Sequence, residues 1–262
     1  MNRKKPLLDP PCYGWTMDLK NPYQAPSNKW LTTPPLMNWI DDTYLDIQRK
    51  NLPLRNVKLI CTLFIAALLI FISPIMIEAS LNDNSRESLI VSILSTSIGV
   101  WTVALGLRFS LSFPRDEPIR FNRARQKVYA YNYKYCWWNP FKHSPIEVVS
   151  YDWSNVRAES WKARASIQGV SILKWGVMLS IVEPGTNKVI DRFPLSSMGL
   201  DEAVWAYVCT YMQEGPTSLP LPNPPLDHND VLWCDIAKRL APRVRWPAGM
   251  DLESRTAPER LS

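Results

Sequence analysis

Two stretches decide the fold of this chain: LICTLFIAALLIFISPIMI, residues 59–77, and SLIVSILSTSIGVWTVALGL, residues 88–107. Neither stretch contains an acidic, basic or histidine residue. A helix rises about 1.5 Å per residue and the hydrocarbon core of a bilayer is about 30 Å thick, so each stretch is long enough to cross a membrane. Apolar side chains cover every side of the first stretch, whereas a core helix of a soluble protein normally keeps one polar side. We therefore expect a transmembrane hairpin over residues 57–113.

The residues that flank the two spans set the expected orientation. Basic residues gather outside both spans: Arg49, Lys50, Arg55 and Lys58 precede the first, and Arg108, Arg115, Arg120, Arg123, Arg125 and Lys127 follow the second. The connecting segment carries three acidic residues and one basic residue. Because positively charged flanks are retained in the cytoplasm, both chain ends are expected there. A transporter or pump is disfavoured, because charged side chains that could form an ion path are absent from both stretches.

Small side chains form a seam along the second span. Its members are Ser92, Ser95, Gly99, Thr102 and Gly106. They follow one another at steps of three or four residues, which places them on one side of a helix and lets a second helix approach closely. Ordinary packing within the hairpin and contact with a partner or a second copy of the chain both fit this seam.

The composition argues against several classes of chemistry. The chain has two histidines, His143 and His228, and five cysteines without a Cys-x-x-Cys pair. Glycine-rich phosphate-binding loops are absent from the sequence. We therefore expect no metal, no cofactor, no catalytic residue and no enzymatic activity. The net charge of +6 is largely explained by the flanks of the spans, so nucleic acid is not an expected partner.

The segments on either side of the hairpin and its domain are rich in proline. Residues 1–56 predict a cytoplasmic proline-rich arm with an amphipathic helix over residues 36–50. The apolar positions of that helix are Leu36, Ile40, Tyr44 and Ile47. Residues 217–262 predict a stiff proline-rich connector, a short helix over residues 231–240 and a loose tail from Pro247 onward.

Residues 114–216 predict a β-rich cytoplasmic domain. A polar turn joins two short strands between Ile119 and Tyr131. Later strands are expected over residues 148–153, 172–182 and 189–193, and the last two are joined by a type II turn at Glu183-Pro184-Gly185-Thr186. Helical spacing returns over residues 200–214 and ends at Gly215-Pro216.

The expected fold class is therefore an integral membrane α+β protein. It has a two-helix transmembrane hairpin and a β-rich cytoplasmic domain closed by a C-terminal helix. A meander of strands followed by one helix is the element order of pleckstrin-homology-like domains, and this analogy concerns the fold alone.

Particular strings in the chain resemble a known family. They are residues 114–131, the pair Trp137-Trp138, residues 151–159, and residues 205–216 followed by Leu219-Pro220. Over roughly residues 50–225 the chain resembles a bacterial family of two-span membrane proteins with a cytoplasmic domain of unknown function, the DUF6708 type. Members are often encoded near type VI secretion or polymorphic toxin genes. The resemblance implies a bacterial inner-membrane location and a part in contact-dependent antagonism, and it supplies no catalytic residues.

Two further groups of residues are candidate surfaces. Basic residues that could contact lipid headgroups are Arg115, Arg120, Arg123, Arg125 and Lys127, although the same charges serve as the topology signal. Aromatic residues that could form a partner surface are Tyr129, Tyr131, Tyr133, Trp137 and Trp138, with packing beneath the C-terminal helix or at the headgroup layer as the structural alternative.

Together these features predict a non-enzymatic inner-membrane interaction protein, most specifically an immunity protein that protects its producer from a cognate toxin of a type VI system. The alternative is an accessory or adaptor component of the secretion system, and a further alternative is a membrane-acting effector. The expected partners are a cognate toxin or secretion-system protein, membrane lipids and a second copy of the chain.

Overall fold

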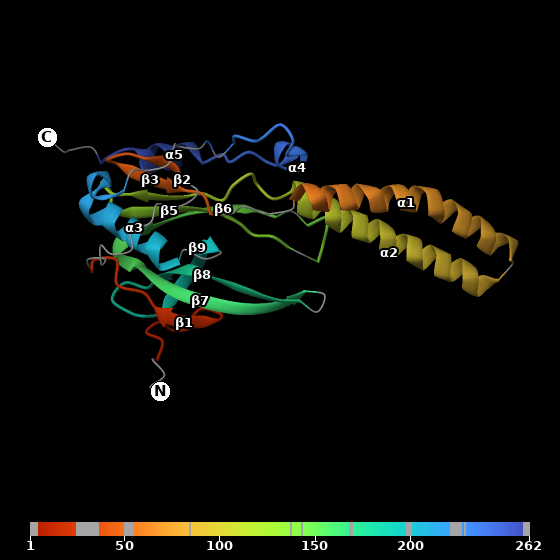
Figure 1. The fold of residues 1–262 in the computed structure, drawn as a ribbon, viewed down its shortest axis with the longest axis horizontal. Helices are drawn as coiled ribbons and strands as arrows, with labels where there is room; N and C mark the ends of the chain where they lie inside the picture. Colours follow the sequence, from red (N-terminus) through yellow and green to blue (C-terminus); the bar gives the residue numbers. More distant parts are fainter. Residues whose placement is uncertain are drawn as a thin grey trace.

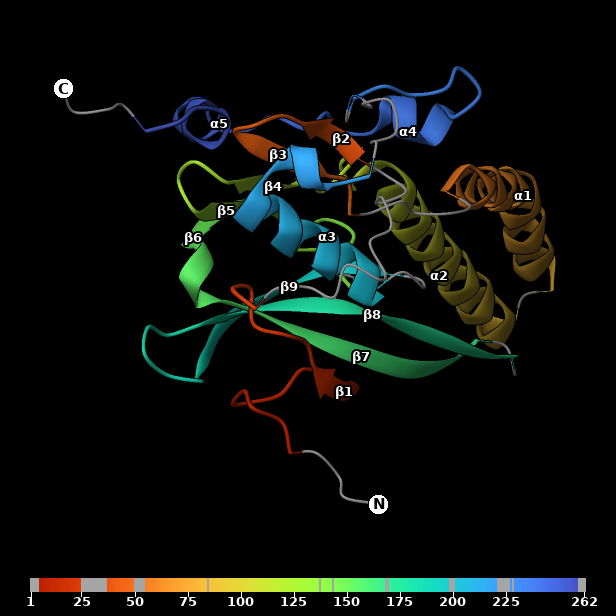
Figure 2. The same cartoon turned by 60° about the vertical axis from the view of Figure 1, so that its left-hand side comes forward.

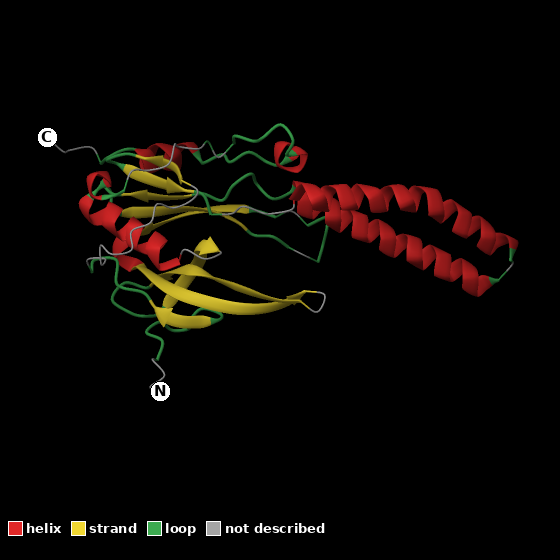
Figure 3. Cartoon of the chain, viewed as in Figure 1, coloured by secondary structure: helices red, strands yellow, loops and turns green. Residues whose placement is uncertain are grey.

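The chain forms a helical hairpin that projects from one end of a domain built from two β-sheets (Figure 1). The computed structural model describes residues 5–24, 37–49, 55–83, 85–136, 138–142, 144–167, 170–197, 201–220, 227 and 229–258. Figure 3 shows two groups of strands in the domain, with one helix between them and short helices along the outer side of the upper group. The predicted combination of apolar helices and a sheet-rich domain is thus confirmed as an α+β architecture.

The hairpin consists of α1 (Arg55–Asn82) and α2 (Arg86–Leu111). Both contain the predicted spans and extend beyond them. By length and apolar composition, each helix is sufficient to cross a membrane. The turn between them ends at Ser85, whose side chain accepts a hydrogen bond from the backbone N–H of Ser88 and so begins α2.

Each sheet is antiparallel throughout. The five-stranded sheet has the order β2 (Met37–Ile40), β3 (Tyr44–Ile47), β4 (Ile119–Asn122), β5 (Lys127–Tyr133), β6 (Ile146–Asp152). The four-stranded sheet has the order β1 (Trp15–Asp18), β7 (Val156–Ile167), β8 (Val170–Val182), β9 (Val189–Ser197). A 3₁₀ turn, Trp153–Asn155, leads the chain from β6 in the first sheet to β7 in the second.

Helix α3 (Asp201–Glu214) packs against strands of both sheets. Figure 2 shows it lying between them. Its buried side chains include Trp205, Val208 and Tyr211, and the Trp205 ring lies 5.5 Å from that of Trp153. The predicted helix over residues 200–214 is therefore confirmed, and so is the preceding turn, where Gly185 has a φ of 75° and Thr186 N–H donates to Glu183 O. A short 3₁₀ turn, Pro216–Ser218, follows.

The predicted amphipathic helix over residues 36–50 is wrong, because this segment forms the hairpin of β2 and β3. Asp41 makes the turn: its Oδ1 accepts hydrogen bonds from the backbone N–H groups of Thr43 and Tyr44, at 2.7 and 2.8 Å. Such an Asx turn competes with helix formation. Strand β3 then pairs with β4, more than seventy residues later, and this pairing buries Leu45. Leu36 and Lys50 lie outside the described residues.

The start of the chain is also more ordered than an irregular arm. β1 pairs with β7, and Cys12 is buried beside the second sheet. The backbone N–H of Cys12 donates to Glu159 Oε1 at 3.0 Å, and Ser180 Oγ donates to the other oxygen of that carboxylate. A buried carboxylate thus fixes the N-terminal segment to the four-stranded sheet.

The predicted loose tail is wrong as well. Residues 248–255 form α5 (Ala248–Arg255), which lies against β4, and Ser254 is fully buried. The short helix expected over residues 231–240 is present only as α4 (Ile236–Leu240). It begins late because Asp235 is its N-cap and accepts a hydrogen bond from Lys238 N–H at 3.0 Å.

Candidate functional site

The small-residue seam of α2 divides into two sides. Gly99 and Gly106 face α1: an added Cβ would lie 2.5 Å from a Leu69 methyl and 2.4 Å from Thr62 Oγ1. Ser92 also faces α1, where its hydroxyl lies 2.6 Å from that of Ser80. These positions are used by the hairpin itself, which is the first of the two alternatives for the seam.

The other two members of the seam, Ser95 and Thr102, are exposed. Ser95 lines a shallow groove between the two helices. Ser73 of α1 and Thr96 of α2 are the other hydroxyl-bearing residues in its lining. Thr102 Oγ1 donates to the Ile98 carbonyl of its own helix. Of the predicted seam, these two positions are the ones that remain open to another molecule.

Burial in the hairpin is the reverse of that in a soluble protein. The buried residues of its helices are Arg55, Leu59, Thr62 and Ser80 in α1, and Ser92, Arg108 and Ser110 in α2. All but one of them are polar or charged. Large apolar side chains such as Phe71 and Ile98 point outward and are about 70% exposed. This arrangement suits an apolar surrounding and not water.

The predicted basic cluster is not a surface patch. Four of its five members bind the C-terminal segment. Arg115 donates to the carbonyls of Asn229, Lys238 and Arg239, and Arg125 donates to those of Thr256 and Ala257. Arg120 binds Asp251 and Ser254, and Lys127 forms an ion pair with Glu253. The fifth, Arg123, is half-buried and lies against Gly215 after α3. The cluster therefore holds the last part of the chain on the five-stranded sheet.

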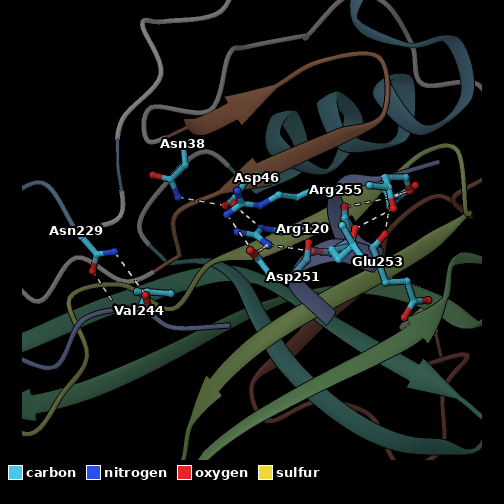
Figure 4. Close-up of polar contacts among 12 residues, drawn as sticks. Asn38, Asp46, Arg120, Asn229, Val244, Asp251, Glu253 and Arg255 are labelled. Atoms are coloured by element: carbon cyan, nitrogen blue, oxygen red, sulfur yellow. Dashed lines mark hydrogen bonds and ion pairs between the residues drawn. The ribbon is translucent and has the colours of Figure 1, made fainter. Parts of the chain in front are cut away.

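Arg120 is the centre of this attachment (Figure 4). Its side chain is 1% exposed, so it does not contact a headgroup in this structure. Nε donates to Asp46 at 2.8 Å and Nη1 donates to Asp251 at 2.6 Å, while the guanidinium lies 4.3 Å from the centre of the Trp246 ring. One arginine thus connects β3, β4 and α5.

The predicted aromatic stripe is divided between two places. Tyr129 and Tyr131 are buried, and Tyr131 packs against Trp246 of the C-terminal segment at 5.6 Å between ring centres. Tyr133 is half-buried and packs against Phe113 just after α2, at 5.1 Å. Trp138 is exposed. Trp137 lies outside the described residues.

Arg55 and Arg108 organise the junction of hairpin and domain. The sequence indicated them only as charges that set the orientation of the spans. Arg55 donates to the carbonyls of Ser110 and Phe113, which closes the C-terminal end of α2. Arg108 donates to the carbonyls of Asn139 and Lys142 in the loop between β5 and β6. The sequence feature that could have indicated this structural role is their position, since each stands near the boundary of an uncharged stretch.

Arg49 connects the two sheets just before the hairpin. Its guanidinium donates to the carbonyls of Tyr131 in β5 and Pro194 in β9, at 2.7 and 3.3 Å. Burial lowers the pKa of Arg49 to about 10, which leaves it charged at neutral pH. The positive charges before the first span are thus partly structural.

Comparison with known families places the chain. Residues 96–258 match the family of unknown function DUF6708, which is more than half of the sequence. The chain belongs to this family. No curated protein and no solved structure matches it. The matched region begins at residue 96, within α2, so it does not cover α1 as expected. It reaches beyond the expected limit near residue 225 and includes α4, which contacts α1 and α2, and α5, which contacts β4.

Metal-ligating groups do not cluster in this DUF6708 protein: among the residues that the structure describes, no three His, Cys, Asp or Glu side chains lie close enough to hold an ion. All five cysteines are free. The features that stand out are surfaces: the outward apolar sides of the hairpin and the end of the domain from which it leaves.

Proposed function

We propose that this DUF6708 protein is an integral membrane interaction protein whose helical hairpin crosses the bacterial inner membrane with both chain ends in the cytoplasm. The single observation that carries the proposal is the reversed burial of α1 and α2, with polar residues between the helices and large apolar side chains outside. In water such a surface would aggregate, whereas lipid chains cover it at no cost.

The specific role that we propose is immunity. A hairpin that exposes Thr102 on α2, and Ser95 in a groove between its helices, offers a place where a membrane-inserting segment of a secreted toxin can pack. The sequence resemblance to proteins encoded near type VI secretion genes supports this role. The domain would then hold the hairpin in register and stay available for cytoplasmic contacts.

A contact-killing competition tests immunity. A clean deletion strain is grown on solid medium against its parent, with the parental secretion system active. Selective killing of the deletion strain, reversed by supplying the gene, is the expected result. Equal survival under demonstrated secretion would contradict immunity, and loss of secretion in the deletion strain would favour an accessory component. Growth arrest when the chain is expressed in a naive host would identify an effector.

Variants of the gene that is supplied to the deletion strain test where the toxin contacts the hairpin. Ser95→Leu together with Thr102→Leu fills the open side of the seam and leaves the positions that face α1 unchanged. We expect these substitutions to abolish protection at normal protein levels. The matched control is Ser97→Leu, at another exposed hydroxyl of α2 outside the seam, which should retain protection. Protection by the double variant would show that the toxin does not contact the seam.

A further inference from the structure

Large apolar side chains are exposed on two segments of the domain where it meets the hairpin. One segment is the stretch that leads into α4, together with α4 itself: Leu232, Trp233, Ile236 and Leu240 are between 57% and 83% exposed. The other is the loop between β5 and β6, where Trp138 and Phe141 are 57% and 78% exposed. Side chains of this size are rarely left in water in such groups.

The first segment is held at the level where α1 begins. Asn56, in the first turn of α1, donates through Nδ2 to Cys234 O at 3.2 Å and accepts from Ala237 N–H at 2.8 Å. The uncharged stretch starts at Leu59, about one helical turn further on. Figure 1 shows α4 beside the base of α1. Ala237 faces the protein and is fully buried, so the exposed apolar residues lie on its other side.

The second segment is held against α2. Arg108 fixes it through the carbonyls of Asn139 and Lys142 and through Ser144 Oγ. The ring of Phe141 contacts Trp101 edge to face, at 5.9 Å between centres. Trp101 belongs to the second uncharged stretch, six residues before its end at Leu107. Phe141 therefore reaches past the end of the domain and alongside a proposed span.

We propose that these two segments seat the domain in the headgroup and upper acyl region of the same bilayer that the hairpin crosses. This inference rests on the proposed membrane hairpin. Their apolar residues continue the outward apolar surface of the hairpin, at α4 beside both helices and at the loop beside α2. Tryptophan and phenylalanine are the side chains that anchor proteins at this depth, and a short helix lying in the interface buries one side in this way.

Insertion of apolar groups, and not charge, supplies the attraction. Residues 227–245 contain four basic residues, Lys238, Arg239, Arg243 and Arg245, and three acidic ones, Asp227, Asp230 and Asp235. The charges nearly cancel, so we expect seating on zwitterionic lipid as well as on anionic lipid. The seat limits tilting of the domain, because α4 lies beside α1 and the loop lies beside α2.

Depth-dependent quenching tests the seat in the full chain. Exposed Cys61 and Cys234 and half-buried Cys136 are replaced by serine, while buried Cys12 and Cys209 stay. An environment-sensitive NBD fluorophore is then attached at one of four new cysteines: Leu240→Cys, Phe141→Cys, Leu252→Cys or Ile70→Cys. The protein is reconstituted in phosphatidylcholine vesicles that carry nitroxide-labelled lipid acyl chains.

Leu252 is the matched control, since it is 67% exposed on α5, whereas Leu240 is 65% exposed on α4. Figure 1 shows α5 away from the hairpin. We expect shallow nitroxides to quench the label at positions 240 and 141 strongly and the label at 252 weakly. Deep nitroxides should quench the label at position 70.

Quenching at positions 240 and 141 no greater than at 252, with the label at 70 quenched, would overturn the seat and leave the membrane hairpin standing. Blue-shifted emission without lipid quenching at positions 240 and 141 would also overturn it, because a protein partner or a second copy would then cover the surface. An unquenched label at position 70 would refute the membrane hairpin itself.

Discussion

In the helical hairpin the large apolar side chains point outward and polar groups lie between the helices, whereas in the β-rich domain the apolar side chains fill the interior. The domain core joins both sheets and α3 through residues such as Phe121, Trp153 and Tyr211. Arg120 and Asp46 form a buried ion pair there, and the buried guanidinium of Arg49 donates to backbone carbonyls. This difference is what the proposed lipid surrounding of the hairpin would require, and the polar junction around Arg55 and Arg108 is where the two regions meet.

The largest effect is expected from breaking a buried charge pair in the domain. Arg120→Ala removes the partner of Asp46 and of Asp251, and leaves Asp46, whose side chain is 2% exposed, without its guanidinium. The free energy of unfolding should fall by about 3–5 kcal/mol. Urea unfolding of the full chain in detergent, followed by tryptophan fluorescence, measures this loss.

Lys127→Ala is the matched control, because its pair with Glu253 is about one-third exposed on both sides. Its cost should stay below about 1 kcal/mol. Equal losses for the two variants would show that the C-terminal segment is not held through Arg120.

In the hairpin the second-largest effect is expected from a steric change, the overpacking of the contact between α1 and α2. Gly106→Leu places new atoms where Thr62 Oγ1 already lies 2.4 Å from an ideal Cβ, and overpacking of this kind costs about 1–3 kcal/mol. We expect slower disulfide formation between cysteines introduced by Ser80→Cys and Ser92→Cys, whose hydroxyls are 2.6 Å apart in the native hairpin. Thr102→Leu, on the exposed side, should leave the rate unchanged. A similar slowing by both leucines would indicate that α1 is not the neighbour of Gly106.

At the junction the expected effect is smaller. Asn56→Ala removes both hydrogen bonds between α1 and the segment around α4, at a net cost of about 1 kcal/mol. The mobility of a nitroxide on exposed Cys234 should rise in electron paramagnetic resonance spectra. The control is Asn21→Ala, which removes a hydrogen bond within a local turn, from Tyr23 N–H to Asn21 Oδ1. Unchanged mobility in the Asn56 variant would mean that other contacts hold α4.

The smallest expected effect is a loss of stability at acidic pH. The hydrogen bond that Lys127 donates lowers the pKa of Glu253 below its ordinary value. A carboxyl group with a depressed pKa in the folded state adds stability above the pKa of the unfolded state, and this stability is lost as the pH falls through the folded value. Because the side chain is partly exposed, the loss between about pH 6 and pH 3 should be below about 1 kcal/mol. Glu253→Gln should remove this part of the pH dependence, and an identical pH profile in both proteins would contradict the assignment.

Much of the β-rich domain was predictable because its signals are local. The β4–β5 hairpin, the turn at Gly185 and α3 were all predicted from spacing and turn residues, and the structure confirms them. The long strand β7 was missed: its sequence alternates poorly, and its position depends on pairing with β1 and β8.

The candidate surfaces were harder to predict than the elements. Spacing located the seam of α2, but it could not show that Gly99 and Gly106 face α1 while Ser95 and Thr102 remain open. The basic residues after α2 looked alike in sequence. Their different partners are backbone carbonyls and carboxylates more than one hundred residues away, which no local pattern reveals.

The sequence by itself determined the two long helices, because an uncharged apolar run of this length carries its own signal in composition. It also determined the strands that are joined by tight turns. The tertiary structure alone decided that residues 37–47 and 15–18 are strands and that residues 248–255 are a helix on the sheet. Segments this short have weak preferences of their own, so distant partners such as β4, β7 and Arg120 select their conformation.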